Sequence, residues 1–560
     1  MIQVNAFRLL LIVLISLFIS CNNTPPPPAT DIASTPEELE KKMPDIVQTA
    51  IKYAVQNEGR MDDSTILHSP KLVWQAYEKK GFAPYWSKRE SWLPLADTMF
   101  RFIREAKLYG LFPVDYHAGR IDSIANLFSS DTLAVKDAVL WAKADLMLSD
   151  AFLRMVKDIR LGRLPNDSMT MRKDTVLSDS FFLEQFDMAQ QAGQIHSLFA
   201  KLEPAHKGYH ALKYAIPSFL DSADNRVYTK VPLSRKDSFA FRAALQKRLF
   251  EGGFISHDSA MVDSETLAEA VKNFQRKYNI KVDGKVGDET TRLLNESDQD
   301  RFARIAITLD KYKQLPEEMP ARYIWVNIPG YELTLVEDDS VLLRSKIICG
   351  KPVTPTPLLT SAISDMITYP QWTIPASIIE KEILPALKKD TNYLAKKGYS
   401  LIDKEGNVIN PGEVDWTKYK KGIPYKVVQG SGDENALGIL KFNFPNKYAV
   451  YLHDTNQRYL FSRDTRSLSH GCVRVQKWDN LAYYIVRYDS KEITGSRRNS
   501  VEDSLTAWLQ RKEKHTIPVG KRLPVFIRYF TCEVNNGRLV FHDDIYGDDK
   551  AIREKFFAGK

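Results

Sequence analysis

The spacing of hydrophobic positions changes along the chain and divides it into regions of different structure. Over residues 45–225 apolar side chains return mainly at helical spacing, with one long amphipathic stretch over 133–161. From about residue 321 onward, apolar and polar residues alternate instead, for example over 324–328 and 448–453. Such alternation is typical of β-strands. The sequence therefore predicts a helical scaffold region followed by a β-rich domain.

A compact unit is expected between these two regions, over residues 237–297. Its central part carries apolar side chains at helical spacing, namely Leu267, Val271, Phe274 and Tyr278. Asp263 and Ser264 precede them and are good N-cap residues. The stretch 282–288 contains two glycines and provides a turn before a short helix over 289–294. We predict a module of three helices.

Near its start the chain has an apolar run over residues 9–19. This run is followed by Ser20, Cys21 and a proline-rich stretch. The run is too short to span a bilayer as a helix, and it fits the hydrophobic part of a secretory signal. The residues that end at Cys21 resemble the lipobox of bacterial lipoproteins. This resemblance implies a signal peptide over 1–20, a lipid anchor on Cys21 and a membrane tether over 21–44. A plain secretory signal is the alternative, and both interpretations predict export.

Length, charge and cysteine number narrow the class of protein further. A chain of 560 residues exceeds what one hydrophobic core normally serves, so we expect several domains. The net charge is +8, but the 78 basic and 70 acidic residues are interleaved, so we expect no nucleic-acid partner. If Cys21 carries lipid, three cysteines remain and at least one is unpaired. We favour Cys472 as the free thiol, and a bridge between Cys349 and Cys532 stays open.

The candidate chemistry lies in the segment Ser469-His470-Gly471-Cys472 and in His453 before it. A cysteine thiolate is a strong nucleophile, and a histidine within hydrogen-bond distance can generate it. Alternation along 448–453 brings Tyr451 and His453 to one face of a strand, from which a loop returns to the thiol. Gly471 removes a side chain beside the nucleophile, so nearby backbone N–H groups can face an oxyanion. This pattern predicts acyl transfer through a thioester.

Residues 435–475 resemble the L,D-transpeptidase catalytic domain, in which a histidine and a spacer precede Ser/Thr-His-Gly-Cys. Thr356-Pro357, Trp372 and Arg474 match the large periplasmic branch of that family. Residues 267–295 closely resemble small peptidoglycan-binding domains, through their Phe-Gln-Arg and Asp-Gly-x-x-Gly features. The resemblance implies a multidomain α+β protein. Its expected parts are a helical scaffold domain over 45–225, a peptidoglycan-binding-like module over 237–297, a β-rich catalytic domain over 318–535 and a C-terminal extension over 536–560.

The same resemblance implies a reaction on peptidoglycan in the periplasm that uses no metal or organic cofactor. Cys472 attacks the carbonyl of the third residue of a tetrapeptide stem, and D-Ala leaves. The side-chain amine of a diamino acid on a neighbouring stem then attacks the thioester and forms a 3→3 cross-link. By position Cys472 is the nucleophile and His453 the general base. The residues that frame the pocket are Ser469, His470 and Gly471.

Three aromatic residues and one arginine have weaker assignments. Arg474 either holds its loop or meets a substrate carboxylate, because a guanidinium binds carboxylates with two hydrogen bonds. The aromatic side chains that we expect along the donor groove are Tyr451, Phe461 and Trp372. Aromatic residues in a β-domain are more often part of the core.

Several alternatives remain. Water in place of the amine would make the protein an L,D-carboxypeptidase, and loss of catalysis would leave a lipoprotein that tethers the envelope to the wall. Cys472, His470, His453 and Asp454 are also competent zinc ligands, and a lone buried cysteine is a further interpretation. A lysine-rich insertion over 377–430 is either a lid over the site or a surface ornament. The three-helix module either binds glycan or acts as a spacer.

Overall fold

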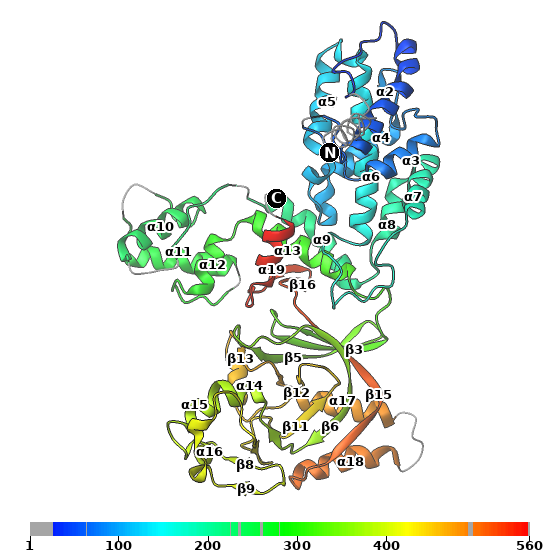
Figure 1. Cartoon of the computed structure of the whole chain (residues 1–560). Coiled ribbons are helices and arrows are strands. Elements are labelled where there is room, and N and C mark those ends of the chain that lie inside the picture. The colour runs from blue at the N-terminus through cyan, green and yellow to red at the C-terminus, as the bar shows by residue number, and fades with distance from the viewer. Residues whose placement is uncertain are drawn as a thin grey trace, which may run out of the picture.

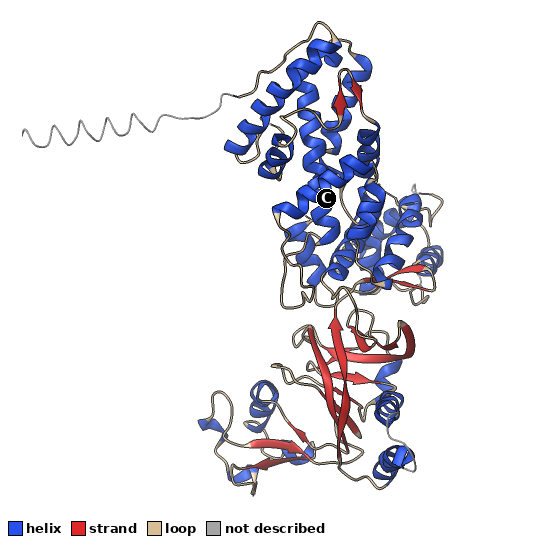
Figure 2. Cartoon of the chain, turned by 90° about the vertical axis from the view of Figure 1, so that its right-hand side faces the viewer, coloured by secondary structure: helices blue, strands red, loops and turns tan. Residues whose placement is uncertain are grey.

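A computed structural model describes residues 26–557, with the exception of 63, 225, 233–236, 258–260, 279 and 491–496. The predicted signal peptide and the predicted lipidation at Cys21 lie outside the described residues. Figure 1 shows the scaffold helices at one end, the β-rich domain at the other, and the three-helix module to one side between them. Helices and strands are accordingly concentrated in different halves of the molecule (Figure 2). No helix in the described part is both long and apolar enough to cross a membrane.

The scaffold domain is helical, as the sequence predicts. Its helices are α2 (Pro36–Gln56), α3 (Pro70–Glu78), α4 (Pro94–Arg104), α5 (Ala118–Ser130), α6 (Ala138–Arg160), α7 (Asp179–Ala192) and α8 (Ile195–Leu202), with a short hairpin of β1 (Ser87–Lys88) and β2 (Ser91–Trp92). Helix α6 lies at the centre, where nearly all of its residues are buried. Trp86 is fully buried, and Phe82 and Tyr85 are almost so, and all three belong to the apolar core of this domain.

The first helix corrects the predicted boundary of the tether over 21–44. Helix α2 begins at Pro36, because the Thr35 side chain accepts a hydrogen bond from the backbone N–H of Glu38 and thereby caps the helix. Proline at the first position and acidic residues in the first turn suit a helix start. Leu39 and Met43 are buried against the scaffold core. The folded domain therefore starts before residue 45.

The peptidoglycan-binding-like module consists of three helices, as predicted: α10 (Ser238–Glu251), α11 (Ser264–Lys277) and α12 (Asp288–Asn295). The Asp263 carboxylate caps α11 by accepting hydrogen bonds from the N–H groups of Glu265 and Thr266. Val271 and Phe274 are buried in a separate apolar cluster, and Leu267 and Tyr278 pack against it. The helical spacing in the sequence thus identified this small core.

A central unit joins these parts and contains the end of the chain. It comprises α9 (Lys207–Ser222), α13 (Asp298–Lys313), the hairpin of β16 (Cys532–Asn535) and β17 (Arg538–Phe541), and α19 (Asp548–Phe556). Tyr209, Ile305 and Phe557 share one apolar cluster there. The prediction of a separate extension over 536–560 was therefore wrong, because these residues complete a core with helices from the middle of the chain. Strand β16 likewise belongs to this unit and not to the catalytic sheet.

The β-rich domain is a nine-stranded sheet of order β13-β5-β14-β12-β11-β6-β15-β3-β4, in which β4 also pairs with β5. The sheet therefore closes on itself around an apolar core. The strands are β3 (Arg322–Asn327), β4 (Glu332–Glu337), β5 (Ser340–Gly350), β6 (Leu359–Thr368), β11 (Leu440–Asn443), β12 (Leu452–His453), β13 (Ser467–Ser469), β14 (Val473–Val475) and β15 (Thr516–Arg528). Two helices, α17 (Trp478–Ser490) and α18 (Arg497–Gln510), accompany it.

The predicted strand over 448–453 is only partly formed. Strand β12 contains only Leu452 and His453, because Ala449 has φ +54°, a left-handed conformation that interrupts extended backbone. Tyr451 and His453 nevertheless lie together, with ring centres 5.6 Å apart. The expected proximity of these two side chains is therefore confirmed.

The insertion over 377–430 folds around its own small core. A four-stranded sheet of order β7-β10-β8-β9 is made by β7 (Trp372–Thr373), β8 (Tyr399–Ile402), β9 (Val408–Ile409) and β10 (Lys426–Gln429). Its helices are α14 (Ala376–Ile378), α15 (Leu384–Leu387) and α16 (Tyr393–Lys396), and a π-helical turn over Ile379–Ile383 lies between the first two. Ile383, Leu394 and Trp416 are buried in one cluster. The insertion is therefore a folded subdomain.

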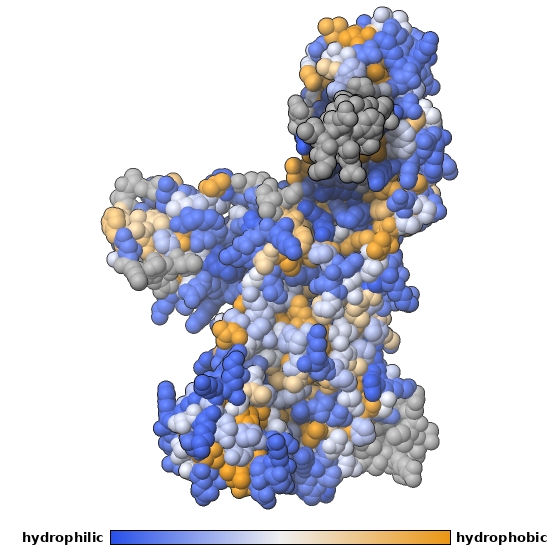
Figure 3. Space-filling view, in the orientation of Figure 1, coloured by the Kyte–Doolittle hydropathy of each residue, from blue (hydrophilic) through white to orange (hydrophobic). Residues whose placement is uncertain are grey.

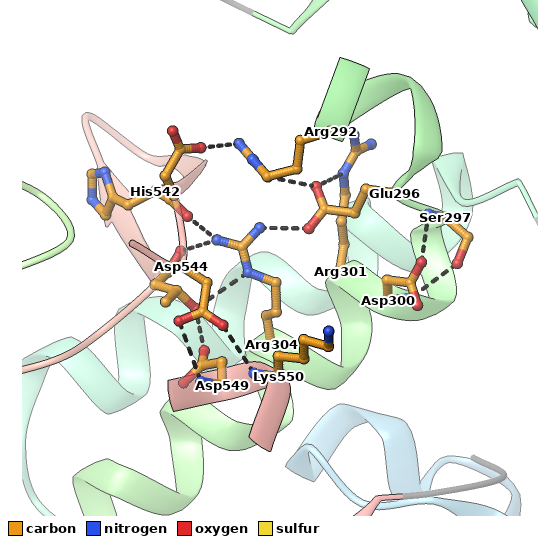
Figure 4. A network of polar contacts seen from close by, with 12 residues as sticks. Arg292, Glu296, Ser297, Asp300, Arg301, Arg304, His542, Asp544, Asp549 and Lys550 are labelled. Carbon is orange, nitrogen blue, oxygen red and sulfur yellow. Dashed lines mark hydrogen bonds and ion pairs between the residues drawn. The ribbon is translucent and has the colours of Figure 1, made fainter. Parts of the chain in front are cut away.

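A buried network of charges joins the three-helix module to the central unit (Figure 4). The Glu296 carboxylate lies between α12 and α13 and accepts hydrogen bonds from Arg304 Nη1 at 2.5 Å and Arg301 Nε at 3.3 Å. Arg304 Nη2 also donates to the carbonyl of Thr531 at 2.9 Å, which links α13 to the C-terminal hairpin. Glu296, Arg301 and Arg304 are all at least nine-tenths buried as side chains.

The molecular surface is mostly hydrophilic on the face shown in Figure 3, with small separate hydrophobic patches.

Candidate active site

The thiol of Cys472 lies in a tight loop between β13 and β14. Strand β13 pairs with β5 in parallel, and β14 pairs with both β5 and β12. In the β12–β14 pair, His453 stands opposite Arg474. The sheet thus brings His453 beside the nucleophile loop from a separate segment, as the sequence predicts. Cys472 and His453 line the same cavity, whose volume is about 120 Å³.

Side-chain hydrogen bonds fix the nucleophile loop from two sides. The Ser469 hydroxyl donates to the carbonyl of Cys472 at 2.6 Å and accepts from the N–H of Gly471 at 3.1 Å. The Thr356 hydroxyl donates to the carbonyl of Gly471 at 2.8 Å and accepts from the N–H of Gly350 at 2.9 Å. Gly471 has φ +120°, where a side chain would be strained. Ser469 and Gly471 therefore shape the loop, and the N–H of Gly471 is engaged within it.

His453 is only 4% exposed, and its environment favours the neutral imidazole. Burial lowers the pKa of His453 to about 3, and the positive charge of Arg474 contributes to the same shift. Backbone groups of Asp454 and Leu437 act in the opposite direction. Nδ1 of His453 has no hydrogen-bond partner in the described part of the chain. At neutral pH the ring is therefore uncharged and able to accept a proton.

The thiol itself is protonated at rest. Burial raises the pKa of Cys472, while hydrogen bonding with Tyr451 and the charges of Lys441 and Arg474 lower it. The Cys472 sulfur also donates a long hydrogen bond, 4.0 Å, to the carbonyl of Ala449. Because the ordinary pKa of a cysteine already exceeds 7, a further rise leaves little thiolate. Attack by the sulfur therefore needs a base at the moment of reaction.

Lys441 is a functional candidate that the sequence did not reveal. It stands opposite His453 in the β11–β12 pair, and its ammonium lies 3.9 Å from the centre of the Tyr451 ring. Burial lowers the pKa of Lys441, whereas the thiolate form of Cys472 raises it. A lysine between two buried residues, Leu440 and Phe442, was a visible signal, but the register with His453 was not. With Arg474, it makes the surroundings of the sulfur electropositive.

Replacing Lys441 with methionine is expected to raise the pKa of the Cys472 thiol, because a nearby positive charge stabilises the thiolate. The rate of iodoacetamide alkylation at Cys472, measured against pH, should then shift to higher pH. Lys447→Met, at an exposed position near the site, is the control and should leave the profile in place. An unchanged profile in Lys441→Met would remove the electrostatic role.

Most of the other residues that the sequence predicts for the site line the cavity, and one of them lies elsewhere. The cavity is lined by Tyr451, Trp372, Ser469, His470 and Arg474. Nη1 of Arg474 donates to Thr455 Oγ1 at 3.3 Å and Gln457 Oε1 at 3.2 Å, which are contacts of a loop-holding residue. Phe461 is not brought to the cavity: it is 2% exposed and packs with Ile348 and Leu460. Its apolar ring is core because the short helix that carries it lies against β5.

Neither the zinc alternative nor the disulfide alternative gains support from the contacts. The Asp454 carboxylate accepts hydrogen bonds from the N–H of Ile439 at 3.1 Å and from Arg458 Nη2 at 2.6 Å. Nε2 of His470 lies 2.5 Å from Glu382 Oε1, so both expected ligands are engaged with other partners. Cys349 and Cys532 are free thiols, buried in two different apolar clusters. The Cys349–Cys532 bridge was therefore a wrong alternative.

Glu382 is a second residue that the sequence did not single out, and it comes from the insertion. It lies in the π-helical turn Ile379–Ile383, and its contact with His470 joins the insertion to the nucleophile loop. Pro375, Ser377 and Ile378 line the same cavity as Cys472. The insertion is therefore placed beside the thiol and forms part of the cavity wall. A position beside the thiol is what a lid over the site requires, and a surface ornament does not require it.

Comparisons with known proteins agree with this arrangement. Residues 321–488 match a family model described as "L,D-transpeptidase catalytic domain". Residues 71–216 match a "Scaffold domain", and residues 240–294 match a "Putative peptidoglycan binding domain". A Haemophilus influenzae protein named "Putative L,D-transpeptidase" is 40% identical over 229 residues. That match covers 41% of this chain and 45% of the relative, so the chain spans less than half of the relative's length.

Solved structures give weaker similarities. An "L,D-transpeptidase from Mycobacterium smegmatis" is 15% identical, with a TM-score of 0.18 over 37% of this chain and 58% of that one. An L,D-transpeptidase structure from Xylanimonas cellulosilytica is 17% identical, with a TM-score of 0.16 over 51% of this chain and 92% of that one. At these TM-scores neither similarity carries an argument of its own.

Proposed function

We propose that this chain, which carries an L,D-transpeptidase catalytic domain over residues 321–488, forms 3→3 cross-links in peptidoglycan through a cysteine thioester. The observation that carries the proposal is the cavity that Cys472 and His453 both line, the first with a protonated thiol and the second with a neutral, buried imidazole. This pairing is what nucleophilic catalysis by a thiol requires. The three-helix module supports peptidoglycan as the substrate.

The first half-reaction begins when the sulfur of Cys472 attacks the carbonyl carbon of the third residue of a donor tetrapeptide. The thiol proton passes to His453, so that the sulfur–carbon bond forms without a free thiolate at rest. His453 then gives this proton to the amide nitrogen of the departing D-Ala. The carbon–nitrogen bond breaks, and the third residue remains on Cys472 as a thioester.

The second half-reaction uses the side-chain amine of a diamino acid from a neighbouring stem. The amine nitrogen attacks the thioester carbonyl and loses a proton to His453. The sulfur leaves as the new amide bond forms, and the proton returns to Cys472. The electropositive surroundings that Lys441 and Arg474 provide favour the departing thiolate.

Export to the periplasm and a lipid anchor on Cys21 are part of the proposal, because peptidoglycan lies outside the cytoplasm. The residues concerned precede the described part of the chain. Metabolic labelling of the full chain with a palmitate analogue, beside Cys21→Ser, tests the anchor. Label that persists in the Cys21→Ser variant would contradict it.

A carbapenem tests the proposed nucleophile, because it acylates an activated active-site cysteine. Intact-mass spectrometry of the wild-type chain is expected to show one stable adduct, and Cys472→Ala is expected to show none. Cys349→Ala should still form the adduct, since Cys349 is buried in the sheet core and burial raises its pKa to about 11. An unmodified wild-type chain in excess drug would count against the transpeptidase proposal.

We further propose that the insertion acts as a lid. It has its own core, so it can move as a body, and Glu382 joins it to His470 beside the thiol. A closed lid would exclude water from the thioester and thereby favour the amine as acceptor.

Glu382→Gln is expected to increase hydrolysis of the donor relative to cross-linking by about two- to fivefold, because a partly exposed contact between a carboxylate and an imidazole contributes up to about 1 kcal/mol. The ratio of tripeptide to cross-linked dimer, measured by mass spectrometry, reports the change. Glu380→Gln, an exposed neighbour on the same turn, is the control. Equal ratios in Glu382→Gln and the wild-type chain would contradict the lid.

A further inference from the structure

A second group of chemically competent side chains lies in the scaffold domain, on segments that contribute nothing to the cysteine site. His68 precedes α3, His117 lies between the short helix η2 (Pro113–Tyr116) and α5, and Asp150 is in the middle of α6. One donor atom from each of the three lies within 4.8 Å of the other two. Three segments that are far apart in sequence therefore converge on one small volume.

Asp150 organises this group. It is fully buried, and its carboxylate accepts hydrogen bonds from the N–H of His68 at 3.0 Å and the N–H of Ser69 at 2.7 Å. Nε2 of His117 lies 2.7 Å from Asp150 Oδ2. The Asp150 carboxylate thus holds the segment of His68 and the ring of His117 around its own oxygen atoms.

The two imidazoles lie against each other. Their ring centres are 5.5 Å apart, with 22° between the planes. His117 has φ +60°, a left-handed conformation that is uncommon for a residue other than glycine. The His117 side chain is 9% exposed, whereas His68 lies at the surface. The group is thus anchored in the domain and open to solvent on the side of His68.

The charged side chains around the group balance one another before an ion binds. Besides Asp150, this part of the domain carries the carboxylates of Asp115, on η2, and Asp158, two turns further along α6. Arg154 and Arg163 lie against Asp115, and Arg154 also approaches Asp158. Lys157 also pairs with Asp158 at 3.2 Å, so three cationic side chains balance the three carboxylates.

We propose that His68, His117 and Asp150 form a binding site for a divalent ion of the zinc class, which ties the segment before α3 to α5 and α6. Two imidazole nitrogens and one carboxylate oxygen are ligands that Zn²⁺ prefers, whereas Mg²⁺ and Ca²⁺ prefer oxygen ligands alone. The ion stabilises the scaffold domain by binding the folded state, in which alone the three segments meet. It takes no part in the reaction at Cys472.

Titration with Zn²⁺ alone, followed by calorimetry on the chain that carries Cys472→Ala, tests the proposal. The background substitution removes the catalytic thiol, which would otherwise compete for zinc. One saturable site per chain is expected, together with a rise in the temperature of thermal unfolding that EDTA reverses. Mg²⁺ at the same concentration should produce neither effect.

Two histidine variants locate the site. His68→Ala is expected to weaken Zn²⁺ binding by at least about tenfold, and its exposed position leaves the fold intact, which circular dichroism checks. His196→Ala, an exposed histidine of the same domain, should bind as the parent chain does. Absence of saturable binding in the parent, or equal weakening in both variants, would overturn the assignment.

Discussion

His453→Ala is expected to slow the acylation of Cys472 by a carbapenem about 10²–10⁴-fold, because the thiol, whose pKa is raised, then has no base to take its proton. The rate can be followed by intact-mass spectrometry of samples quenched at increasing times. His515→Ala, a histidine of the same domain that contacts Glu513, is the matched control and should react at the wild-type rate. Equal rates for His453→Ala and the wild-type chain would exclude His453 as the base.

The pH dependence of acylation is an independent test of the protonation state of His453. The pKa of His453 is lowered to about 3, so its basic form is present above that pH and is lost only as the pH falls through about 3. The wild-type rate is therefore expected to show no loss from histidine protonation between about pH 7 and pH 5, in contrast to a histidine of ordinary pKa near 6.5. A fall centred near pH 6.5 that vanishes in His453→Ala would contradict the buried, neutral base.

Glu296→Gln is expected to cost about 3–5 kcal/mol of stability, because it removes the counter-charge of the buried Arg304 guanidinium and leaves the buried Arg301 guanidinium with Asp298 alone. Burial raises the pKa of Glu296, but the charges of Arg304, Arg301 and Arg292 outweigh this effect and lower it. Figure 4 shows the carboxylate at the centre of these contacts. Urea-induced unfolding, followed by circular dichroism, should reveal an earlier transition for the central unit.

Two comparisons make this stability prediction specific. Glu318→Gln removes an exposed carboxylate and should shift no transition. Because the pKa of Glu296 is depressed in the folded chain, its contribution is present above the unfolded value near 4.3 and is lost as the pH falls further. The difference between Glu296→Gln and the wild-type chain should therefore shrink in acid. A difference that is constant from pH 7 to pH 3 would show that the charge of Glu296 is not the cause.

Local patterns allowed much of the fold to be predicted from the sequence. Asp263 caps α11, and Val271 and Phe274 bury its inner face, because capping and helical spacing are properties of neighbouring residues. The start of α2 at Pro36 was missed although Thr35 and Pro36 carry the signal, because the preceding prolines dominated the interpretation of that segment. The sequence could not predict which domain residues 536–560 join, because this depends on packing against α9 and α13.

The candidate site, too, could be predicted from the sequence only in part. Cys472 and His453 were found from a motif and its spacing, and the parallel β12–β14 pair brings them to one cavity. Lys441 and Glu382 were not found, because strand register and the placement of the insertion bring them to the thiol. Phe461 was assigned to the groove on its residue type, but a three-dimensional contact with Ile348 decides that it is core. Sequence identifies groups with chemistry of their own, whereas groups that act through position need the fold.

The measurement that most directly tests the central claim is mass spectrometry of purified tetrapeptide muropeptides after incubation with the wild-type chain and with Cys472→Ala. The proposal predicts dimers that have lost one D-Ala, in the wild-type sample alone. Tripeptide monomers without dimers, again dependent on Cys472, would replace the transpeptidase by a carboxypeptidase. Unchanged substrate in the wild-type sample, from a chain that a carbapenem acylates at Cys472, would contradict the proposed cross-linking activity.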